Sequence, residues 1–381
     1  MKFSCDSSLL FKSINIVEKA IAQKSTISVL ENICFELSES KLILRANDLE
    51  IGIEHAIDVM VDPTHSIFPT SVLIKGKTIS GIFSKISPQI IQITVDENNR
   101  FKIVGKGVNY DIMGMSSDDF PVFPEINNGE HVQLSLDDMR LLIRSTLFSV
   151  SSDETKPFLN GIFVKSDQHI LSFVATDGFR LALRQISTQT QVENIAVIIP
   201  SKAMKELTKV MGFLDTVSPL NMVISSHQVA FFSDRFRLVS RVIEGYFPDY
   251  KQVIPKLSSY QVKVSRKEFI EACERAMIIA SVSNFVVRLT FEGESLLLRA
   301  NASMGEFREE LYVVRTKGEG TVKISFNVKL ILEGVREIDS DDIELEFNEG
   351  LSPCIIRASG QTDYVYLAMP IRTNDYQEDT F

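Results

Sequence analysis

The sequence predicts an α+β protein made of three repeated domains, each with two helices and two short antiparallel sheets. Three segments of the 381-residue chain open with an alternating strand that leads through a polar residue into an amphipathic helix. Breaks at Ala46, Ala175 and Ala300 recur at a spacing of about 125–130 residues. A period of this length is typical of a chain built from whole repeated domains, and we place these at 1–128, 129–258 and 259–381.

The opening of each repeat is a strand followed by a helix. The strands are expected at 2–5, 132–136 and 262–264, and the helices at 9–22, 139–150 and 269–280. A side chain at the start of each helix is expected to accept hydrogen bonds from its first amide groups. The candidates for this N-cap are Ser8, Asp137 or Asp138, and Ser265.

The rest of each repeat predicts a hairpin, a second helix and closing strands. The hairpins are expected at 33–37 with 41–46, 161–164 with 170–175, and 287–291 with 295–300. The second helices are expected at 77–86, 201–211 and 327–335. The closing strands are expected at 91–95 with 101–104, at 229–242, and at 343–347 with 354–357 and 364–369. Asp119-Phe120-Pro121 and Tyr246-Phe247-Pro248 end the first two repeats, where proline removes a donor from the strand.

Composition and charge limit the kind of partner. A net charge of −10 argues against a protein that grips nucleic acid by its bulk electrostatic field. The start of the chain lacks the pattern of a secretory signal, and no run approaches about 20 apolar residues, so we expect a cytoplasmic protein without membrane contact. The cysteines are too widely spaced for a metal cluster and are expected to be buried thiols, so neither a metal nor another cofactor is predicted. They are Cys5, Cys34, Cys273 and Cys354.

Motifs for catalysis are incomplete. Gly76-Lys77-Thr78 lacks the earlier glycine of a phosphate-binding loop, because Ser71 occupies that position. Gly105-Lys106-Gly107 lacks its third glycine. The sequence therefore predicts a non-enzymatic protein. Two alternatives stay open: an α+β repeat enzyme with a site at a domain junction, and a structural oligomer that binds an acidic partner or none.

Basic side chains recur on the predicted helices. Lys202, Lys205 and Lys209 are three and four residues apart and therefore share one helical face. Arg140 and Arg144 do the same on the first helix of that repeat. Such faces favour contact with a phosphate backbone that does not depend on base sequence.

Short motifs in a fixed order make the whole chain resemble the bacterial β sliding clamp family, the beta subunit of DNA polymerase III. These motifs are Met1-Lys2-Phe3, Leu159-Asn160-Gly161, 175–181 (Ala-Thr-Asp-Gly-Phe-Arg-Leu), Phe247-Pro248-Asp249-Tyr250 and Met369-Pro370-Ile371-Arg372. The resemblance implies three domains of the DNA-clamp type in a head-to-tail homodimer, with helices lining a ring interior and sheets outside. A ring linked topologically to DNA needs only weak contact, so an acidic exterior is compatible with this function.

The resemblance implies a protein that encircles duplex DNA without regard to sequence and tethers the replicative DNA polymerase, which makes synthesis processive. Other implied partners are the clamp loader, other polymerases and repair proteins. The implied DNA contacts are Lys24, Lys156 and Phe158 in the loop 153–158, and Lys202. Lys156 would contact phosphate and Phe158 would offer a stacking surface. Pro157 departs from the family, since an aromatic residue is frequent there.

The family's partner site is an apolar cleft between the second and third domains that receives a short linear peptide. The walls implied here are Leu159, Thr176, Gly178, Phe179, Arg180, Leu181, Pro248, Val253, Phe285, Leu367, Met369, Pro370, Ile371 and Arg372. Phe179 stands where histidine is frequent and Gln252 where arginine is frequent. The chain continues past Arg372 into an acidic tail, 373–381, which could shade the cleft.

The dimer edge implied by the family joins the first repeat of one subunit to the third repeat of the other. Opposite charges at the two ends of the chain fit such a heterologous contact. Apolar packing is expected to dominate it, since exposed ion pairs contribute only about 0–1 kcal/mol each. The expected residues are Arg100, Lys102 and Tyr110 on one side and Ile279, Glu306, Glu309 and Glu310 on the other.

Overall fold

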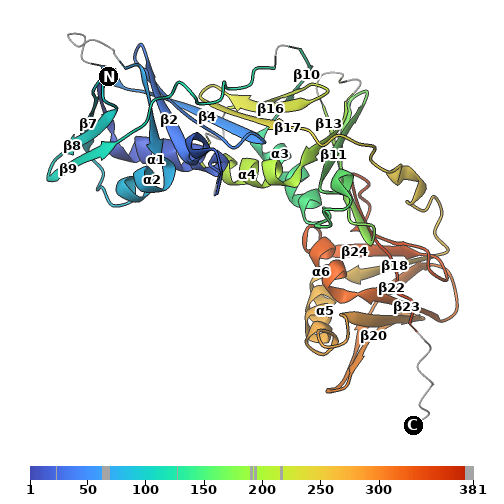
Figure 1. Ribbon diagram of the computed structural model, residues 1–381. Helices are drawn as coiled ribbons and strands as arrows, with labels where there is room; N and C mark the ends of the chain where they lie inside the picture. The colour runs from blue at the N-terminus through green and yellow to red at the C-terminus, as the bar shows by residue number, and fades with distance from the viewer. Residues whose placement is uncertain are drawn as a thin grey trace. The chain divides into compact units, whose positions relative to one another are not determined.

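The computed structural model describes residues 1–22, 24–61, 69–126, 128–188, 192, 195–214 and 218–373. The chain divides into two compact units, and each is described by itself. Unit 1 holds residues 1–139 and 202–242, and unit 2 holds residues 140–201 and 243–381. Over the described residues the chain forms six α-helices and four antiparallel sheets, which confirms the α+β class (Figure 1).

All six predicted helices are present. They are α1 (Ser7–Val17), α2 (Gly76–Phe83), α3 (Leu136–Leu147), α4 (Ser201–Met211), α5 (Arg266–Ala280) and α6 (Val328–Arg336). The opening helices α1, α3 and α5 begin two or three residues before the predicted starts. The predicted starts lie too far along the chain because the first turn of each helix is mostly polar, so the apolar period becomes visible only in the second turn.

The residues that cap the opening helices differ in part from the prediction. The Asp6 carboxylate, not Ser8, accepts from the amides of Ser8 and Leu9 at 2.8 and 3.1 Å. The Ser135 hydroxyl, not Asp137 or Asp138, accepts from the Asp138 amide at 3.0 Å. Ser265 caps α5 as predicted, accepting from the Glu268 amide. In the two wrong cases the predicted residues lie inside the first turn of the helix, and the side chain directly before the helix is the one that reaches its first amides.

Unit 1 contains two sheets. The first has the order β5 (Met60–Val61), β1 (Lys2–Asp6), β7 (Ile90–Val95), β8 (Arg100–Gly105) and β9 (Val108–Met113). The second has the order β10 (Glu130–Leu134), β15 (Leu220–Ile224), β16 (Gln228–Ser233), β17 (Phe236–Arg241), β4 (Ile51–Asp58), β3 (Lys41–Asn47), β2 (Asn32–Ser38) and β6 (Ser71–Lys75). Helix α1 packs against β3 and β4 through Leu10, Ile14 and Val17, which are fully buried.

Unit 2 contains the other two sheets. One has the order β14 (Ala196–Pro200), β11 (Gly161–Asp167), β12 (Ile170–Thr176), β13 (Arg180–Ser187), β26 (Tyr364–Ala368), β25 (Cys354–Ala358), β24 (Asp342–Phe347), β18 (Tyr260–Ser265) and β22 (Val314–Lys317). The other has the order β21 (Gly305–Tyr312), β20 (Ser295–Ala302), β19 (Val286–Glu292) and β23 (Val322–Asn327).

The expectation of two separate sheets in each repeat was wrong in one respect. Strand β17 of the second repeat pairs with β4 of the first, and β26 of the third repeat pairs with β13 of the second. Each pairing fuses two short sheets into one long sheet, because an exposed strand edge is satisfied by a neighbouring edge. Alternation of apolar residues predicts strands but does not identify the partner of an edge strand.

The strand registers align the three repeats residue by residue. In each repeat one row of directly opposed residues runs from the opening strand to the last strand of the same sheet. The rows are Phe3, Ile93, Ile103 and Tyr110; Val132, Met222, Phe231 and Leu238; Val262, Leu345, Ile356 and Tyr366. The Ala46, Ala175 and Ala300 breaks lie opposite Ile53, Ala182 and Phe307 in their hairpins. Tyr110, Leu238 and Tyr366 are therefore equivalent positions, and so are Ile53, Ala182 and Phe307.

Helix α6 packs closely on the last strand of unit 2. A Cβ added at Gly334 would lie 2.2 Å from the Tyr366 ring, so only glycine allows this approach. The Tyr366 hydroxyl donates to the Leu330 carbonyl oxygen at 2.6 Å. The ring is fully buried, and the aromatic side chain thus fastens α6 to β26.

Candidate interaction sites

The turn between β12 and β13 carries four of the predicted cleft residues. The Asp177 carboxylate accepts from the amides of Phe179 and Arg180 at 2.9 and 3.0 Å. The Thr176 hydroxyl donates to the Arg180 carbonyl oxygen at 2.6 Å, and Gly178 has a φ of +91°, which favours glycine. These bonds fix the turn and leave the Phe179 side chain 68% exposed.

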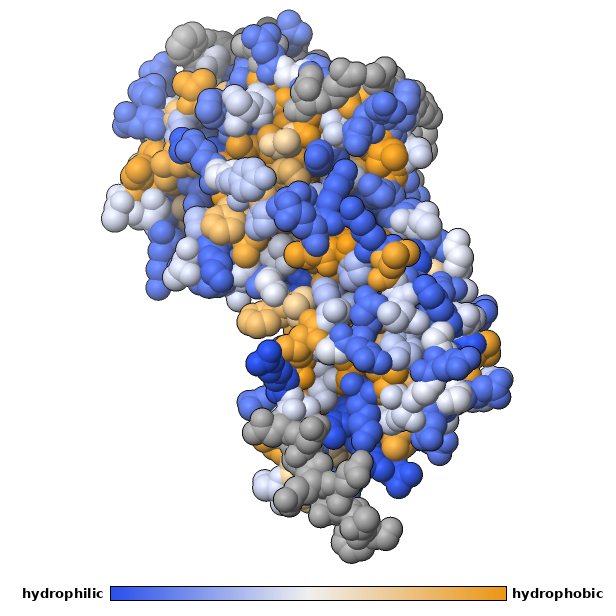
Figure 2. Space-filling model, turned by 90° about the vertical axis from the view of Figure 1, so that its right-hand side faces the viewer, coloured by the Kyte–Doolittle hydropathy of each residue, from blue (hydrophilic) through white to orange (hydrophobic). Residues whose placement is uncertain are grey.

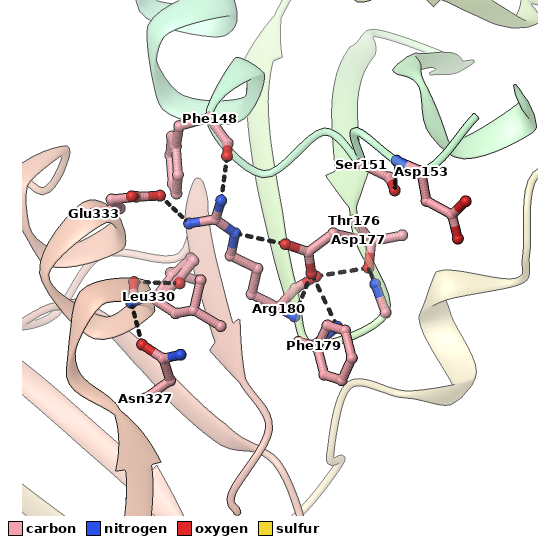
Figure 3. A network of polar contacts seen from close by, with 12 residues as sticks. Phe148, Ser151, Asp153, Thr176, Asp177, Phe179, Arg180, Asn327, Leu330 and Glu333 are labelled. Carbon is pink, nitrogen blue, oxygen red and sulfur yellow. Dashed lines mark hydrogen bonds and ion pairs between the residues drawn. The ribbon is translucent and has the colours of Figure 1, made fainter. Parts of the chain in front are cut away.

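Arg180 lies at the centre of a polar network within unit 2 (Figure 3). Its Nε donates to Asp177 at 3.0 Å, and its two terminal nitrogens donate to the Glu333 carboxylate and to the Phe148 carbonyl oxygen. Burial alone would lower the pKa of Arg180, but the bond to Glu333 and the neighbouring charges raise it above its ordinary value. The guanidinium therefore stays charged and is bonded to the protein itself, while the Phe179 ring points away from the network (Figure 3).

An apolar cluster lies beneath this turn. It contains the predicted cleft residues Leu159, Leu181 and Leu367, all nearly fully buried. The cluster is completed by Val174, Leu183, Ile198, Phe247 and Tyr250. The three predicted leucines would therefore form the floor of the predicted cleft and not its surface. The prediction missed Val174 and Tyr250, although the Phe247-Pro248-Asp249-Tyr250 motif was a signal for the second of them.

Apart from Arg372, the exposed part of the predicted cleft is apolar. Val253 is 49% exposed and Met369 is 37% exposed, and Pro248 and Gly178 are exposed as well. The Met369 amide donates to the Phe179 carbonyl oxygen at 2.9 Å, which extends the pairing of β13 with β26 and holds these two side chains on neighbouring strands. We name Phe179, Val253 and Met369 the apolar rim.

The remaining cleft residues lie on the third repeat. The Ile371 amide donates to the Ser325 carbonyl oxygen at 2.8 Å, between half-buried Pro370 and exposed Arg372. Phe285 is half-buried against the larger core of unit 2 and has a φ of +61°, which is strained for a bulky side chain. Asn284 has a similar φ, of +58°. Thr373 is the last described residue of the predicted tail, and 374–381 lie outside the described residues.

The predicted DNA contacts fall into two groups. Lys24 and Lys156 are exposed. Phe158 instead lies within the 3-10 turn Pro157–Leu159, where it is half-buried and packs against the apolar cluster. Much of its ring is therefore covered by the protein. Lys202 forms ion pairs with Asp48 and Glu50 at 2.7 Å each. Burial alone would lower the pKa of Lys202, but these bonds raise it above the ordinary value.

The predicted dimer residues lie on the edge strands β9 and β21 or on the elements next to them, β8 and α5. In unit 1, Arg100 pairs with Asp111 at 3.0 Å, and Lys102 and Tyr110 are exposed. In unit 2, Arg275 pairs with Glu309 through two nitrogens, and this hydrogen bond lowers the pKa of Glu309. Glu306 is exposed, and Ile279 is half-buried against the core.

A cavity of about 310 Å³ in unit 1 is lined by Glu54, Phe232 and Arg237 among others and contains none of the predicted site residues. In the described ranges no group of three or more histidine, cysteine or acidic side chains is placed to hold a metal ion. None of the helices over those ranges has the length and apolar character needed to cross a bilayer.

Comparison with known proteins identifies the family. Models of the N-terminal, central and C-terminal domains of the DNA polymerase III beta subunit match residues 1–124, 133–249 and 251–372. Beta sliding clamps of Staphylococcus epidermidis and Staphylococcus aureus are each 30% identical over 378 residues, which covers 98% of this chain and all of the relative.

Solved structures of the same family have the same fold as this chain. The DNA polymerase sliding clamp of Bacillus subtilis superposes with a TM-score of 0.91 at 28% identity, and the beta subunit of Thermotoga maritima with 0.89 at 27%. Both comparisons cover 98% of this chain and all of the other. The repeat-enzyme alternative is thereby set aside, and the chain belongs to the DNA polymerase III beta subunit family, the bacterial sliding clamps, which are non-catalytic processivity factors of that polymerase.

Proposed function

We propose that two copies of this chain close into a head-to-tail ring around duplex DNA and tether the replicative polymerase through the cleft of unit 2. The three repeats of each copy would together supply the six domains of the ring. The clamp loader, other polymerases and repair proteins would be further partners of the same cleft. Such a protein would act in the cytoplasm, where the chromosome is replicated. The repeat edges carry this proposal.

Two strand edges of neighbouring repeats pair within the chain. Leu238 lies opposite Ile53 where β17 meets β4, and Tyr366 lies opposite Ala182 where β26 meets β13. Each pairing joins the last strand of one repeat, β17 or β26, to the strand that follows the predicted hairpin of the repeat before it, β4 or β13. Two equivalent strands have no such partner in the described sheets. They are β9, the last strand of the first repeat, and β21, which follows the predicted hairpin of the third repeat, and both are edge strands.

Exposure supports a partner for these two strands. Leu238, Ile53, Tyr366 and Ala182 are fully buried, while the equivalent Tyr110 is 36% exposed and the equivalent Phe307 is half-buried. Tyr110 continues the fully buried row of Phe3, Ile93 and Ile103, so its side chain is on the core face of the sheet but lacks cover. A second copy that pairs its β21 with β9 would cover it.

The equivalence gives a register for the contact between copies. Tyr110 would lie opposite Phe307 of the partner subunit, and Asp111 would lie opposite Glu306 of the partner subunit. The charge of Asp111 is compensated by Arg100 at 3.0 Å and by Lys102, which lies directly opposite Asp111 on β8. Two such contacts are related by the twofold axis and close the ring, since a heterologous contact that closes after two subunits forms no open fibre.

Topology reconciles DNA binding with the net charge of −10. A closed ring stays on DNA because it surrounds the duplex, and weak phosphate contacts leave it able to slide. Exposed Lys24 and Lys156 are the better candidates for such contacts. Lys202 would first have to exchange its ion pairs with Asp48 and Glu50.

Retention on circular DNA tests the function. The chain is loaded with a clamp loader onto nicked circular duplex DNA and separated by gel filtration, before and after the circle is cut once. We expect co-elution with the circle and loss of the protein from the linear product. Equal retention on both forms would contradict a ring and indicate binding by a surface patch.

A further inference from the structure

The chain that leaves the cleft is fastened to the third repeat up to its last described residue. Thr373 Oγ1 accepts from the Arg288 guanidinium at 3.0 Å and lies 3.3 Å from the Ser325 hydroxyl oxygen. Four residues earlier, Met369 is bonded to Phe179. Residues 374–381 therefore begin at a fixed point, next to the predicted cleft.

We propose that residues 374–381 are an intramolecular ligand of the cleft and compete there with partner peptides. This inference rests on the proposed function of the cleft. The segment lies beyond residue 372, where the match to the C-terminal domain model ends.

Reach allows the segment to return to the apolar rim. Thr373 and Met369 are four residues apart and so at most about 14 Å from each other, because an extended chain spans about 3.4 Å per residue. By the same measure the eight residues 374–381 reach up to about 27 Å from Thr373. The tail can therefore pass Met369 and lie along Phe179 without unfolding any described element.

The chemistry of the segment matches that of the site. The sequence Asn-Asp-Tyr-Gln-Glu-Asp-Thr-Phe places two aromatic residues, Tyr376 and Phe381, among three carboxylates. The rim offers exposed apolar surface at Phe179, Val253 and Met369, and Lys251 and Arg372 beside it are exposed and basic. Aromatic anchors in an apolar site with charged residues at its edge are typical of linear peptide recognition.

A tethered ligand needs little intrinsic affinity. A short linker holds its ligand at an effective concentration of about 1 mM, so a tail whose own Kd is about 0.1 mM would weaken an external peptide about tenfold. A partner with several contacts would still displace it. The tail would weaken every partner of the cleft by the same factor, so that at a given concentration weak partners are excluded while strong ones still bind.

The first test measures a labelled peptide on full-length protein. The probe is a fluorescent decapeptide from the replicative polymerase that carries glutamine and leucine, followed by anisotropy. The variant is Tyr376→Ala with Phe381→Ala, and the matched control is Asn374→Ala with Thr380→Ala, which changes polar residues of the same segment. We expect the aromatic variant to bind the probe about tenfold more tightly and the control to bind like the unchanged chain.

A chain that ends at Thr373 serves as the second variant, and a synthetic 374–381 peptide as the competitor. The truncated chain should match the aromatic variant, and the synthetic peptide should displace the probe from it at millimolar concentration. Equal probe affinity in the unchanged and truncated chains would overturn the inference and leave the cleft function standing. Failure of the probe to bind any variant would overturn the cleft function itself. A difference that grows with protein concentration would assign the tail to a second copy and refute the intramolecular contact.

Discussion

The Arg180 guanidinium lies over the Phe148 ring, 5.3 Å from its centroid, and joins the end of α3 to the turn before β13. The same guanidinium reaches Glu333 on α6, so a single side chain links the second and third repeats inside unit 2. Arg180 is 8% exposed. We interpret Arg180 as the support that positions the Phe179 turn, while under the proposed function the exposed apolar rim would contact a peptide.

Removal of Arg180 should destabilise unit 2. Arg180→Ala would leave the Glu333 carboxylate and the Phe148 carbonyl oxygen without their donors, and loss of one partner of a buried pair costs about 3 kcal/mol at the lower end of the usual range. Arg180→Lys should recover little, since an ammonium group cannot reproduce the planar set of donors. Urea denaturation measures the free energy of unfolding of both variants. Arg144→Ala, which removes an exposed ion pair with Glu337, is the control and should change stability by less than about 1 kcal/mol.

The apolar rim should contribute to peptide affinity and little to stability. Phe179→Ala removes a mostly exposed ring, so we expect a change in unfolding free energy within about 0.5 kcal/mol. An aromatic anchor of an interface is worth about 2 kcal/mol or more, which corresponds to a roughly 30-fold loss of affinity for the polymerase peptide. Val122→Ala, at an exposed position in unit 1, is the control.

Met369→Ala with Pro370→Ala examines the same site from the other strand. We expect peptide binding to be lost while the dimer remains intact, since neither residue lies on β9 or β21. Anisotropy and analytical ultracentrifugation measure the two properties separately. A dimer that dissociates would mean that these residues support the fold and do not line a binding site.

The periodic parts of the fold were predictable from the sequence. The amphipathic pattern placed α4 at its observed bounds, and the Ala46, Ala175 and Ala300 breaks occupy equivalent register positions in their hairpins. These features depend on local spacing, which the sequence contains directly. The fusion of β17 with β4 depends on which edge meets which, and no local pattern encodes that choice.

The sequence names candidate cleft residues but does not separate the buried ones from the exposed ones. Leu159, Leu181 and Leu367 were named with Phe179 and Met369, yet the first three are buried and the other two are exposed. Burial separates floor from rim, and it follows from contacts between distant segments. Glu333 was missed altogether, because a lone carboxylate on a helix gives no sign that it meets an arginine 153 residues away.

A cysteine pair can test the register of the dimer. Directly opposed residues of an antiparallel pair have Cα atoms about 4.5–5.5 Å apart, which lies within the range of a disulfide. Tyr110→Cys with Phe307→Cys should therefore form an intersubunit disulfide under mild oxidation, visible as a covalent dimer on a non-reducing gel. The four native cysteines are buried and should not interfere.

The control for the register is Tyr110→Cys with Glu309→Cys. Glu309 lies two residues further along the strand, where diagonal Cα atoms are about 7–8 Å apart and a disulfide is disfavoured. Efficient cross-linking of this pair, with none for the first, would contradict the register derived from the internal pairings. A covalent ring made from the first pair should also stay longer on linear DNA whose ends are blocked.

The free energy of unfolding should decrease as the pH is lowered, because His55 in unit 1 is buried. Burial, with the nearby charges of Lys12 and Arg235, lowers the pKa of His55 to about 4. Its Nδ1 lies 3.0 Å from the Ser13 hydroxyl oxygen. That hydroxyl donates to the Leu9 carbonyl oxygen at 3.0 Å, so a neutral ring with a proton on Nδ1 satisfies the contact.

The direction of this pH dependence follows from the protons bound by the native and the unfolded chain. Between pH 6.5 and 4 the unfolded chain protonates His55 and the native chain does not, so stability is fully present above pH 6.5 and declines toward pH 4. At pH 5 the loss should be about 2 kcal/mol relative to pH 7. Urea denaturation at the two pH values should show this loss in the unchanged chain and in His131→Gln, an exposed control, but much less of it in His55→Gln. An equal loss in all three would mean that other groups, chiefly carboxylates, produce the pH dependence.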